Sequence, residues 1–205
     1  MRAWGEAVLM GPRVERLLRG VVRRVLARGE PHPWWLPRRV LTVVSADVDI
    51  TAGVGEIWIV WRPKSPRMRE HIALVERYDE QWRHVGGGGC PGDDPVDVDV
   101  LDVCSGGGVL SLTRSLDPPH SMTMAPLISC AKVRLGRDVA HVLVGGRRIA
   151  VPEQRMLIAV WASSQISRGV RPVVVALGRD GAELSRLGPR DSLDTYTWAR
   201  LREES

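Results

Sequence analysis

Arginine and tryptophan are concentrated at the start of the chain. The first 39 residues contain nine Arg and three Glu, a formal charge of +6, whereas residues 40–205 hold twenty basic and twenty-one acidic side chains. Guanidinium groups bind phosphate and carboxylate oxygens through paired hydrogen bonds, and tryptophan favours the boundary between lipid headgroups and acyl chains. This combination is typical of a surface that meets an acidic partner. The candidate binding residues are Arg16, Arg19, Arg23, Arg24, Trp34, Trp35, Arg38 and Arg39.

Three kinds of acidic partner fit this segment. An anionic membrane surface ranks slightly ahead of an acidic protein, and nucleic acid ranks below both. A further alternative stays open, in which the segment only packs on the chain's own sheet and its arginines are merely solvated. Since no run approaches the roughly 18 apolar residues of a membrane span, we expect no transmembrane segment. We expect a cytoplasmic protein, peripheral at the membrane if it binds lipid.

Cysteine, histidine and aspartate do not form a metal-binding pattern. Structural zinc sites usually contain closely spaced cysteine pairs, whereas Cys90, Cys104 and Cys130 are far apart, and His84 six residues before Cys90 does not supply such a pair. Residues 93–102 contain five aspartates but lack the glycine and distal glutamate of a calcium-binding loop. We therefore expect no metal or cofactor, and reduced thiols in place of disulfides.

Support for catalysis is weak but leaves one alternative to a noncatalytic binding domain. Cys90 lies in a glycine-rich stretch, residues 86–95, and His84 lies just before it. A thiol with a nearby imidazole could act as a nucleophile and base, so a small hydrolase with a site near this stretch is the second hypothesis. The Gly-flanked Ser105 does not match the strand-to-helix motif of hydrolase nucleophiles.

The basic segment contains the clearest helix signal of the sequence. Apolar residues from Val14 to Leu26 recur at three- and four-residue intervals, and arginines occupy the opposite side. Pro12 suits the first helical position, Gly29 suits a left-handed C-terminal cap, and Pro31 prevents extension. These features predict an amphipathic helix over residues 12–28.

Beyond residue 40 the pattern predicts a mainly β fold. Short Val- and Ile-rich runs are separated by Gly, Pro and Asp turns, which favours an antiparallel β-sandwich of two sheets with one N-terminal amphipathic α-helix. We divide the chain into residues 1–39, the basic helix and its Trp- and Pro-rich linker, and residues 40–205, the β-sandwich body. The glycine-rich stretch 86–95 is expected to be a loop that separates early from late strands. The strands are expected at 40–50, 56–62, 71–78, 96–104, 108–115, 139–144, 147–151, 156–163 and 172–178.

One internal similarity bears on the arrangement of these strands. Residues 57–61 and 157–161 are alike and lie one hundred positions apart, and each is followed by a polar loop and another apolar run. The similarity indicates either a duplicated hairpin or chance resemblance between Val-rich strands.

Overall fold

The structure is a computed structural model that describes residues 12–66, 68–89, 99–111, 126–163 and 170–204. Its helices are α1 (Pro12–Leu26) and α2 (Thr195–Glu203). Its strands are β1 (Leu41–Asp49), β2 (Val54–Trp61), β3 (Arg69–Tyr78), β4 (Gln81–Gly88), β5 (Leu101–Leu110), β6 (Leu127–Leu135), β7 (His141–Val144), β8 (Arg147–Ala150), β9 (Met156–Ser163), β10 (Val174–Leu177) and β11 (Glu183–Leu187).

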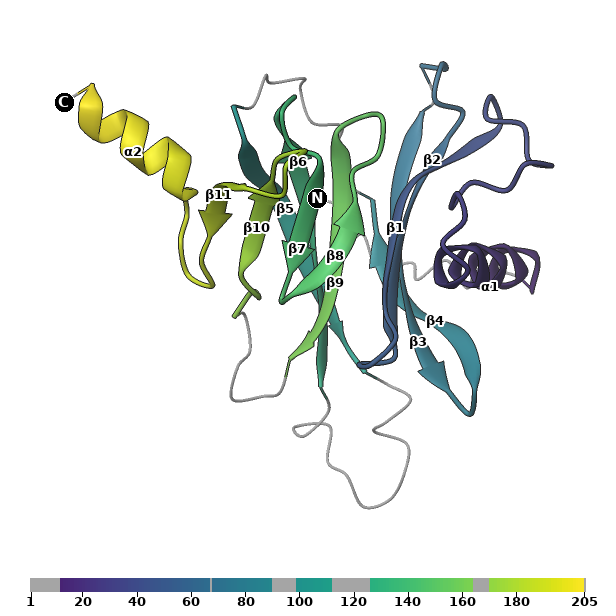
Figure 1. Cartoon of the computed structure of the whole chain (residues 1–205). Coiled ribbons are helices and arrows are strands. Elements are labelled where there is room, and N and C mark those ends of the chain that lie inside the picture. Colours follow the sequence, from purple (N-terminus) through teal and green to yellow (C-terminus); the bar gives the residue numbers. More distant parts are fainter. Residues whose placement is uncertain (1–11, 67, 90–98, 112–125, 164–169, 205) are drawn as a thin grey trace, which may run out of the picture.

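The strands form three antiparallel sheets (Figure 1). Sheet A has the order β1-β2-β3-β4, sheet B the order β5-β6-β9, and sheet C the order β11-β10-β7-β8. Apolar side chains fill the spaces between α1 and sheet A, between sheets A and B, and between sheets B and C. The predicted mainly β antiparallel fold with an N-terminal helix is therefore confirmed, and a third sheet joins the two that the sequence predicts.

Strand β2 shows why sheet A needs cover on both faces. All its residues from Val54 to Val60 are buried. Ile57 and Ile59 pack toward α1, while Trp58 and Val60 pack toward sheet B. The apolar run from Ile57 to Val60 suits a strand buried on both sides, so α1 and sheet B are both required to cover it.

The end of α1 differs from the prediction. The helix stops at Leu26, and Arg28, not Gly29, takes the left-handed conformation with φ +55°. The Gly29 N–H donates to the Arg24 carbonyl over 2.9 Å, and the Arg28 N–H donates to the Val25 carbonyl over 2.9 Å. These two bonds make a Schellman motif, which satisfies carbonyls in the last helical turn.

Glycine-containing strands were not predicted correctly. Residues 86–88 belong to β4, and residues 106–108 continue β5 in place of a break between two strands. A side chain at Gly86 would lie 2.6 Å from Val109, and one at Gly87 would lie 2.1 Å from the Ile72 carbonyl oxygen. Glycine here allows close approach of neighbouring strands and does not mark a loop. Residues 90–98, which include the rest of the predicted loop, lie outside the described residues.

Two further differences concern segments that the sequence left unassigned. Strand β6 contains the buried Lys132, whose charge interrupts the apolar pattern but lies 3.3 Å from Glu70 and 4.2 Å from the Trp58 ring centroid. Helix α2 begins directly after the capping residue Asp194 and ends near the C-terminus.

The similarity between residues 57–61 and 157–161 does not reflect a duplicated hairpin, because β2 pairs with β3 whereas β9 and β10 lie in different sheets.

Sheets A and B are joined at one side by side chains. The backbone N–H of Ile158 donates to Ser45 Oγ over 3.2 Å, and that of Val160 donates to Asp47 Oδ2 over 2.9 Å. Both donors belong to β9, the edge strand of sheet B, and both acceptors belong to β1, the edge strand of sheet A. Two N–H groups on the open edge of β9 thus find acceptors without a neighbouring strand.

Arg147 extends this junction to sheet C. Its Nη1 and Nη2 donate to the two oxygens of Asp47 over 2.5 and 3.0 Å. Nη2 also donates to the Val160 carbonyl over 2.7 Å. Since Arg147 belongs to β8 of sheet C, its contacts with β1 and β9 link all three sheets.

We expect Arg147→Met to lower the free energy of unfolding by about 3 to 5 kcal/mol, because it leaves the buried Asp47 carboxylate without its cation. Chemical denaturation measures the loss. A second change, Asp47→Asn, should recover part of it, since the amide oxygen can still accept from Val160. The control is Arg200→Met, which removes an exposed ion pair with Asp99 and should cost at most about 1 kcal/mol. Equal losses for the two arginines would contradict this role of Arg147.

We expect Leu18→Ala to lower the free energy of unfolding by about 2 to 5 kcal/mol, because Leu18 is 1% exposed between α1 and sheet A. The matched control is Leu26→Ala in the same helix, where the side chain is 41% exposed and the change should stay within about 0.5 kcal/mol. Thermal and urea unfolding measure both. A negligible effect of Leu18→Ala would mean that residues 40–205 fold independently of the helix.

Candidate functional site

The segment between α1 and β1 is a stiff turn held to sheet A by a buried histidine. Leu36 N–H donates to the Pro33 carbonyl over 3.0 Å, which closes the turn. His32 is 4% exposed, and its Nδ1 accepts from Val43 N–H over 3.2 Å, while its Nε2 lies 2.8 Å from the Leu36 carbonyl oxygen. Because Nδ1 accepts, the ring proton is on Nε2, which donates to Leu36. His32 therefore fixes the turn against β1.

This turn presents the two predicted tryptophans to solvent. Trp34 is 84% exposed and Trp35 is 59% exposed. An indole ring that stays exposed does not gain the free energy that burial in the core would give. Clusters of exposed apolar side chains commonly mark interaction surfaces. The nearby Leu26 and Val40 are also exposed.

The predicted binding arginines of α1 have mixed surroundings. Those with exposed side chains are Arg16 and Arg23. Arg19 donates to Glu15, one helical turn earlier, over 2.9 Å, and Arg24 Nε donates to the Glu30 carbonyl over 2.9 Å. The apolar face of α1 is turned toward sheet A. The helix therefore offers charge, but not its main apolar stripe, to a partner.

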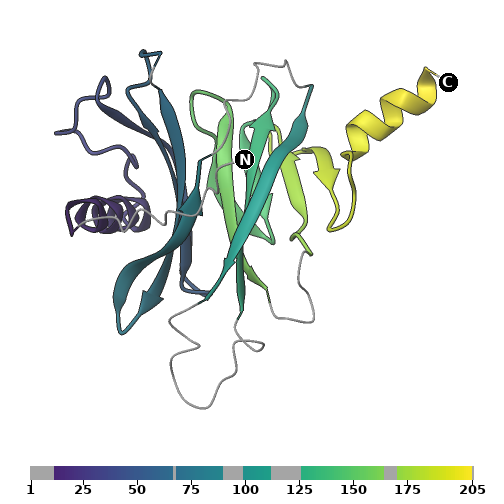
Figure 2. The ribbon, with the colours of Figure 1, turned by 180° about the vertical axis from the view of Figure 1, so that it is seen from behind.

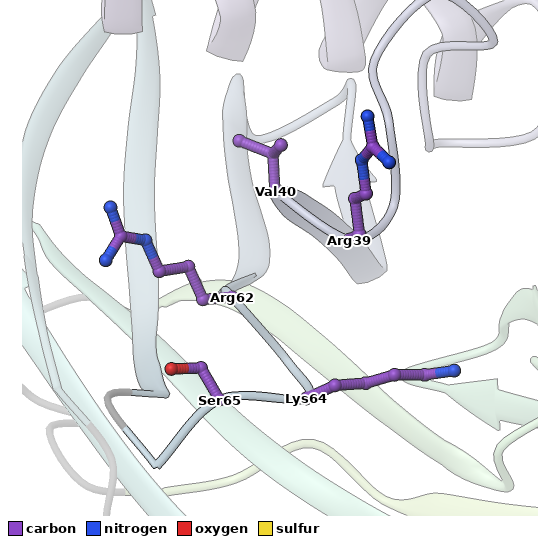
Figure 3. A pocket seen from close by; sticks show the side chains of 5 residues that line it. All are labelled: Arg39, Val40, Arg62, Lys64 and Ser65. Carbon is purple, nitrogen blue, oxygen red and sulfur yellow. The ribbon is translucent and has the colours of Figure 1, made fainter.

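A shallow pocket of about 410 Å³ lies beside the turn, at the end of sheet A where β1 begins. It is lined by Arg39 and Val40 from the turn and by Arg62, Lys64 and Ser65 from the loop after β2 (Figure 3). The Arg62 N–H donates to the Val40 carbonyl over 2.9 Å and ties the two segments together. Of the predicted residues, the pocket contains only Arg39.

Sequence reasoning missed Arg62 and Lys64. A usable signal was present, because residues 62–66 form a basic, Pro-containing turn directly after a buried strand. Recognising their place beside Arg39 requires the pairing of β1 with β2, in which Leu41 lies opposite Trp61. Figure 3 shows the three cationic ends lying apart around the pocket, so they form a broad positive surface and do not converge on a single anion.

A second group of titratable residues lies buried between sheets A and B. Glu56 and Asp47 are directly opposite each other on β2 and β1, and they are 0% and 5% exposed. Neither oxygen of Glu56 has a hydrogen-bond partner of good geometry among the described residues. Burial raises the pKa of Glu56 well above its ordinary value, the Asp47 charge raises it further, and the Cys130 thiol partly offsets both effects.

Burial likewise raises the pKa of Asp47, although hydrogen bonding and charge from Arg147 work in the opposite direction. Carboxyl groups with raised pKa values often mark catalytic sites, but catalysis also requires that a substrate reach them. Neither carboxyl group has appreciable exposure. We therefore interpret this pair as part of the folded core.

The residues of the hydrolase hypothesis are only partly described. Cys90 lies outside the described residues, as do the aspartates at 93–97. His84 lies on the side of sheet A that α1 covers, with its ring centroid 6.4 Å from that of His71. Burial lowers the pKa of both imidazoles, and neither Nε2 has a hydrogen-bond partner among the described residues. These histidines thus form a half-buried pair against the helix.

The chain matches no protein-family model, no curated protein and no solved structure. Within the described part of the chain, neither helix is long and apolar enough to cross a membrane. The chemistry of the basic and aromatic surface therefore carries the functional argument by itself.

We expect Glu56→Gln to stabilise the protein increasingly as pH rises. Because the folded-state pKa is raised, the wild type takes up a proton on folding and loses stability as pH rises above the ordinary carboxyl value of about 4.3. The difference in unfolding free energy between variant and wild type should grow by up to about 1.4 kcal/mol per pH unit until the folded-state pKa is reached. Urea denaturation from pH 4 to pH 8 measures it.

Glu76→Gln is the matched control for this experiment. Glu76 is equally buried, but its carboxylate accepts a hydrogen bond from Ser111 Oγ over 2.6 Å, so no comparable gain is expected. A Glu56→Gln difference that does not change with pH would show that Glu56 is not protonated on folding.

Proposed function

We propose that this protein is a noncatalytic binding or accessory domain that engages an acidic partner through its basic N-terminal segment, and that the partner is an anionic membrane surface. The protein would then be cytoplasmic and peripheral at the membrane. The observation that carries the proposal is the exposure of Trp34 and Trp35 on a fixed turn beside Arg38 and Arg39.

The physical support comes from combining charge with exposed indole rings. Anionic lipids attract basic residues near the surface by about 1 kcal/mol each, and tryptophan prefers the headgroup region. The only acidic residue between positions 28 and 40 is Glu30, which is paired with Arg38. The turn therefore offers both attraction at long range and apolar area for insertion.

The burial of the apolar face of α1 restricts how this binding could occur. A helix that lies in a membrane interface must bury its own apolar stripe there. Leu18, Val21 and Val22 are instead buried against sheet A. We propose that α1 contributes electrostatic attraction only, and that insertion is left to the turn.

Among other acidic partners, an acidic protein could use the same charges, whereas nucleic acid would not need two inserted indoles. The second hypothesis is a small hydrolase whose site includes Cys90 or His84 near residues 86–95, and burial favours the neutral form of His84 by lowering its pKa. It lacks a described nucleophile, because Cys90 lies outside the described residues.

Cosedimentation with vesicles of phosphatidylcholine and phosphatidylserine tests the proposal. Binding should be strong at low salt and weaken toward 1 M salt, as the Debye length falls from about 10 Å at 0.1 M to about 3 Å. Trp34→Ala combined with Trp35→Ala should weaken binding roughly tenfold or more, since each half-buried indole removes about 100 Å² from water.

Trp198→Ala is the matched control, because Trp198 is 45% exposed on α2, far from the turn in Figures 1 and 2. It should leave vesicle binding unchanged. A parallel gel-shift assay with duplex DNA at the same ionic strength identifies the partner. The absence of vesicle binding at low salt, or binding that prefers DNA, would contradict the membrane proposal.

A further inference from the structure

We infer that the protein meets anionic lipid headgroups end-on, through the turn 31–40 together with the loop 62–65, and that Arg62 and Lys64 are lipid-binding residues. This inference rests on the proposed function, which it deepens by defining the surface that faces the membrane. The alternative orientation is side-on, with the outer face of α1 against the lipid.

The two segments form one structural unit. They flank the paired ends of β1 and β2, where Leu41 lies opposite Trp61, and the Arg62 N–H donates to the Val40 carbonyl over 2.9 Å. Both lie at the same end of sheet A in the two opposite views of Figures 1 and 2. A surface that contacts the turn at this end would therefore meet the loop as well.

The loop is shaped to hold its basic side chains at the surface. Arg62 has φ +49°, a left-handed conformation that is uncommon for a residue with a side chain and turns the chain directly after β2. Ser65 N–H donates to the Arg62 carbonyl over 2.9 Å, which closes the loop. Pro63 further limits its freedom. Arg62 and Lys64 are both exposed.

The distribution of charge favours a bilayer over a single bound anion. Residues 62–66 contain two basic side chains and no acidic one. The cationic ends of Arg39, Arg62 and Lys64 lie apart around the pocket in Figure 3. A phosphate site would require donors that converge on one point, whereas a headgroup layer presents many anions over a wide area. The spread positive surface fits the headgroup layer.

The side-on orientation would bring fewer of the exposed basic and aromatic side chains of the turn and the loop to the lipid. The outer face of α1 carries Arg16 and Arg23, and Arg19 is already paired with Glu15. In Figure 1 the helix lies across the middle of sheet A, whereas the turn extends from it toward the end of the sheet. Contact through the helix face alone would not engage the loop after β2.

Paired charge reversals distinguish the two orientations. Arg62→Glu with Lys64→Glu and Arg16→Glu with Arg23→Glu make the same change in net charge on two exposed surfaces. With phosphatidylserine-containing vesicles at about 0.1 M salt, where the Debye length is about 10 Å, the first variant should bind about thirtyfold or more weakly. The second should weaken binding by less than about tenfold, because α1 contributes attraction at long range without contacting the headgroups. Thermal melts check that both variants are folded.

Arg39→Glu with Lys64→Glu provides an independent variant that leaves the left-handed Arg62 unchanged, and it should also weaken binding about thirtyfold. If wild type binds vesicles but Arg16→Glu with Arg23→Glu weakens binding more than the loop variants, the end-on inference is wrong and the membrane proposal stands. If wild type does not bind vesicles at low salt, the membrane proposal itself fails.

Discussion

A carboxylate and a guanidinium, those of Asp47 and Arg147, meet where all three sheets come together. Removing two such ions from water costs several kcal/mol each, so they are tolerated only where their remaining donors and acceptors are satisfied. Here the Val160 N–H donates to Asp47 and the Val160 carbonyl accepts from Arg147. The pair thus supplies hydrogen-bond partners to Val160 at the edge of β9 and links sheets A, B and C.

This arrangement has a consequence for the neighbouring strand. Glu56 lies directly opposite Asp47, and the guanidinium of Arg147 is already bound to both oxygens of Asp47. A second ionised carboxylate would therefore lie in a poorly solvated space beside a like charge, which is why the pKa of Glu56 is raised. The same burial that perturbs these carboxyl groups also keeps substrates away. Their raised pKa values follow from burial at the sheet junction and are not evidence for catalysis.

The parts of the fold that follow from local pattern could be predicted from the sequence. The amphipathic period of α1 and the Val-rich runs of β1 to β3 specify their own structure. Strand β6 escaped prediction because Lys132 is buried, and its partner Glu70 is 62 positions away. Strand β4 was not predicted because a glycine such as Gly87 usually indicates a loop. Its close approach to Ile72, which explains the glycine, is known only from the structure. At the candidate site, the arginines and tryptophans of the turn could be identified from the sequence. Arg62 and Lys64 could not, because only the pairing of β1 with β2 places them beside the turn.

The folded core also determines what the basic segment can offer. Because sheet A buries the apolar side of α1, the exposed indoles of Trp34 and Trp35 do not depend on the helix for their presentation. They depend on His32, whose Nδ1 accepts from the Val43 N–H of β1 and whose Nε2 donates to the Leu36 carbonyl within the turn. A turn held in this way loses little conformational entropy when it meets a partner, so more of the favourable free energy of contact remains as affinity. Under the proposed function, burial of the apolar face of α1 leaves insertion to the turn, and the hydrogen bonds of His32 preorganise that turn.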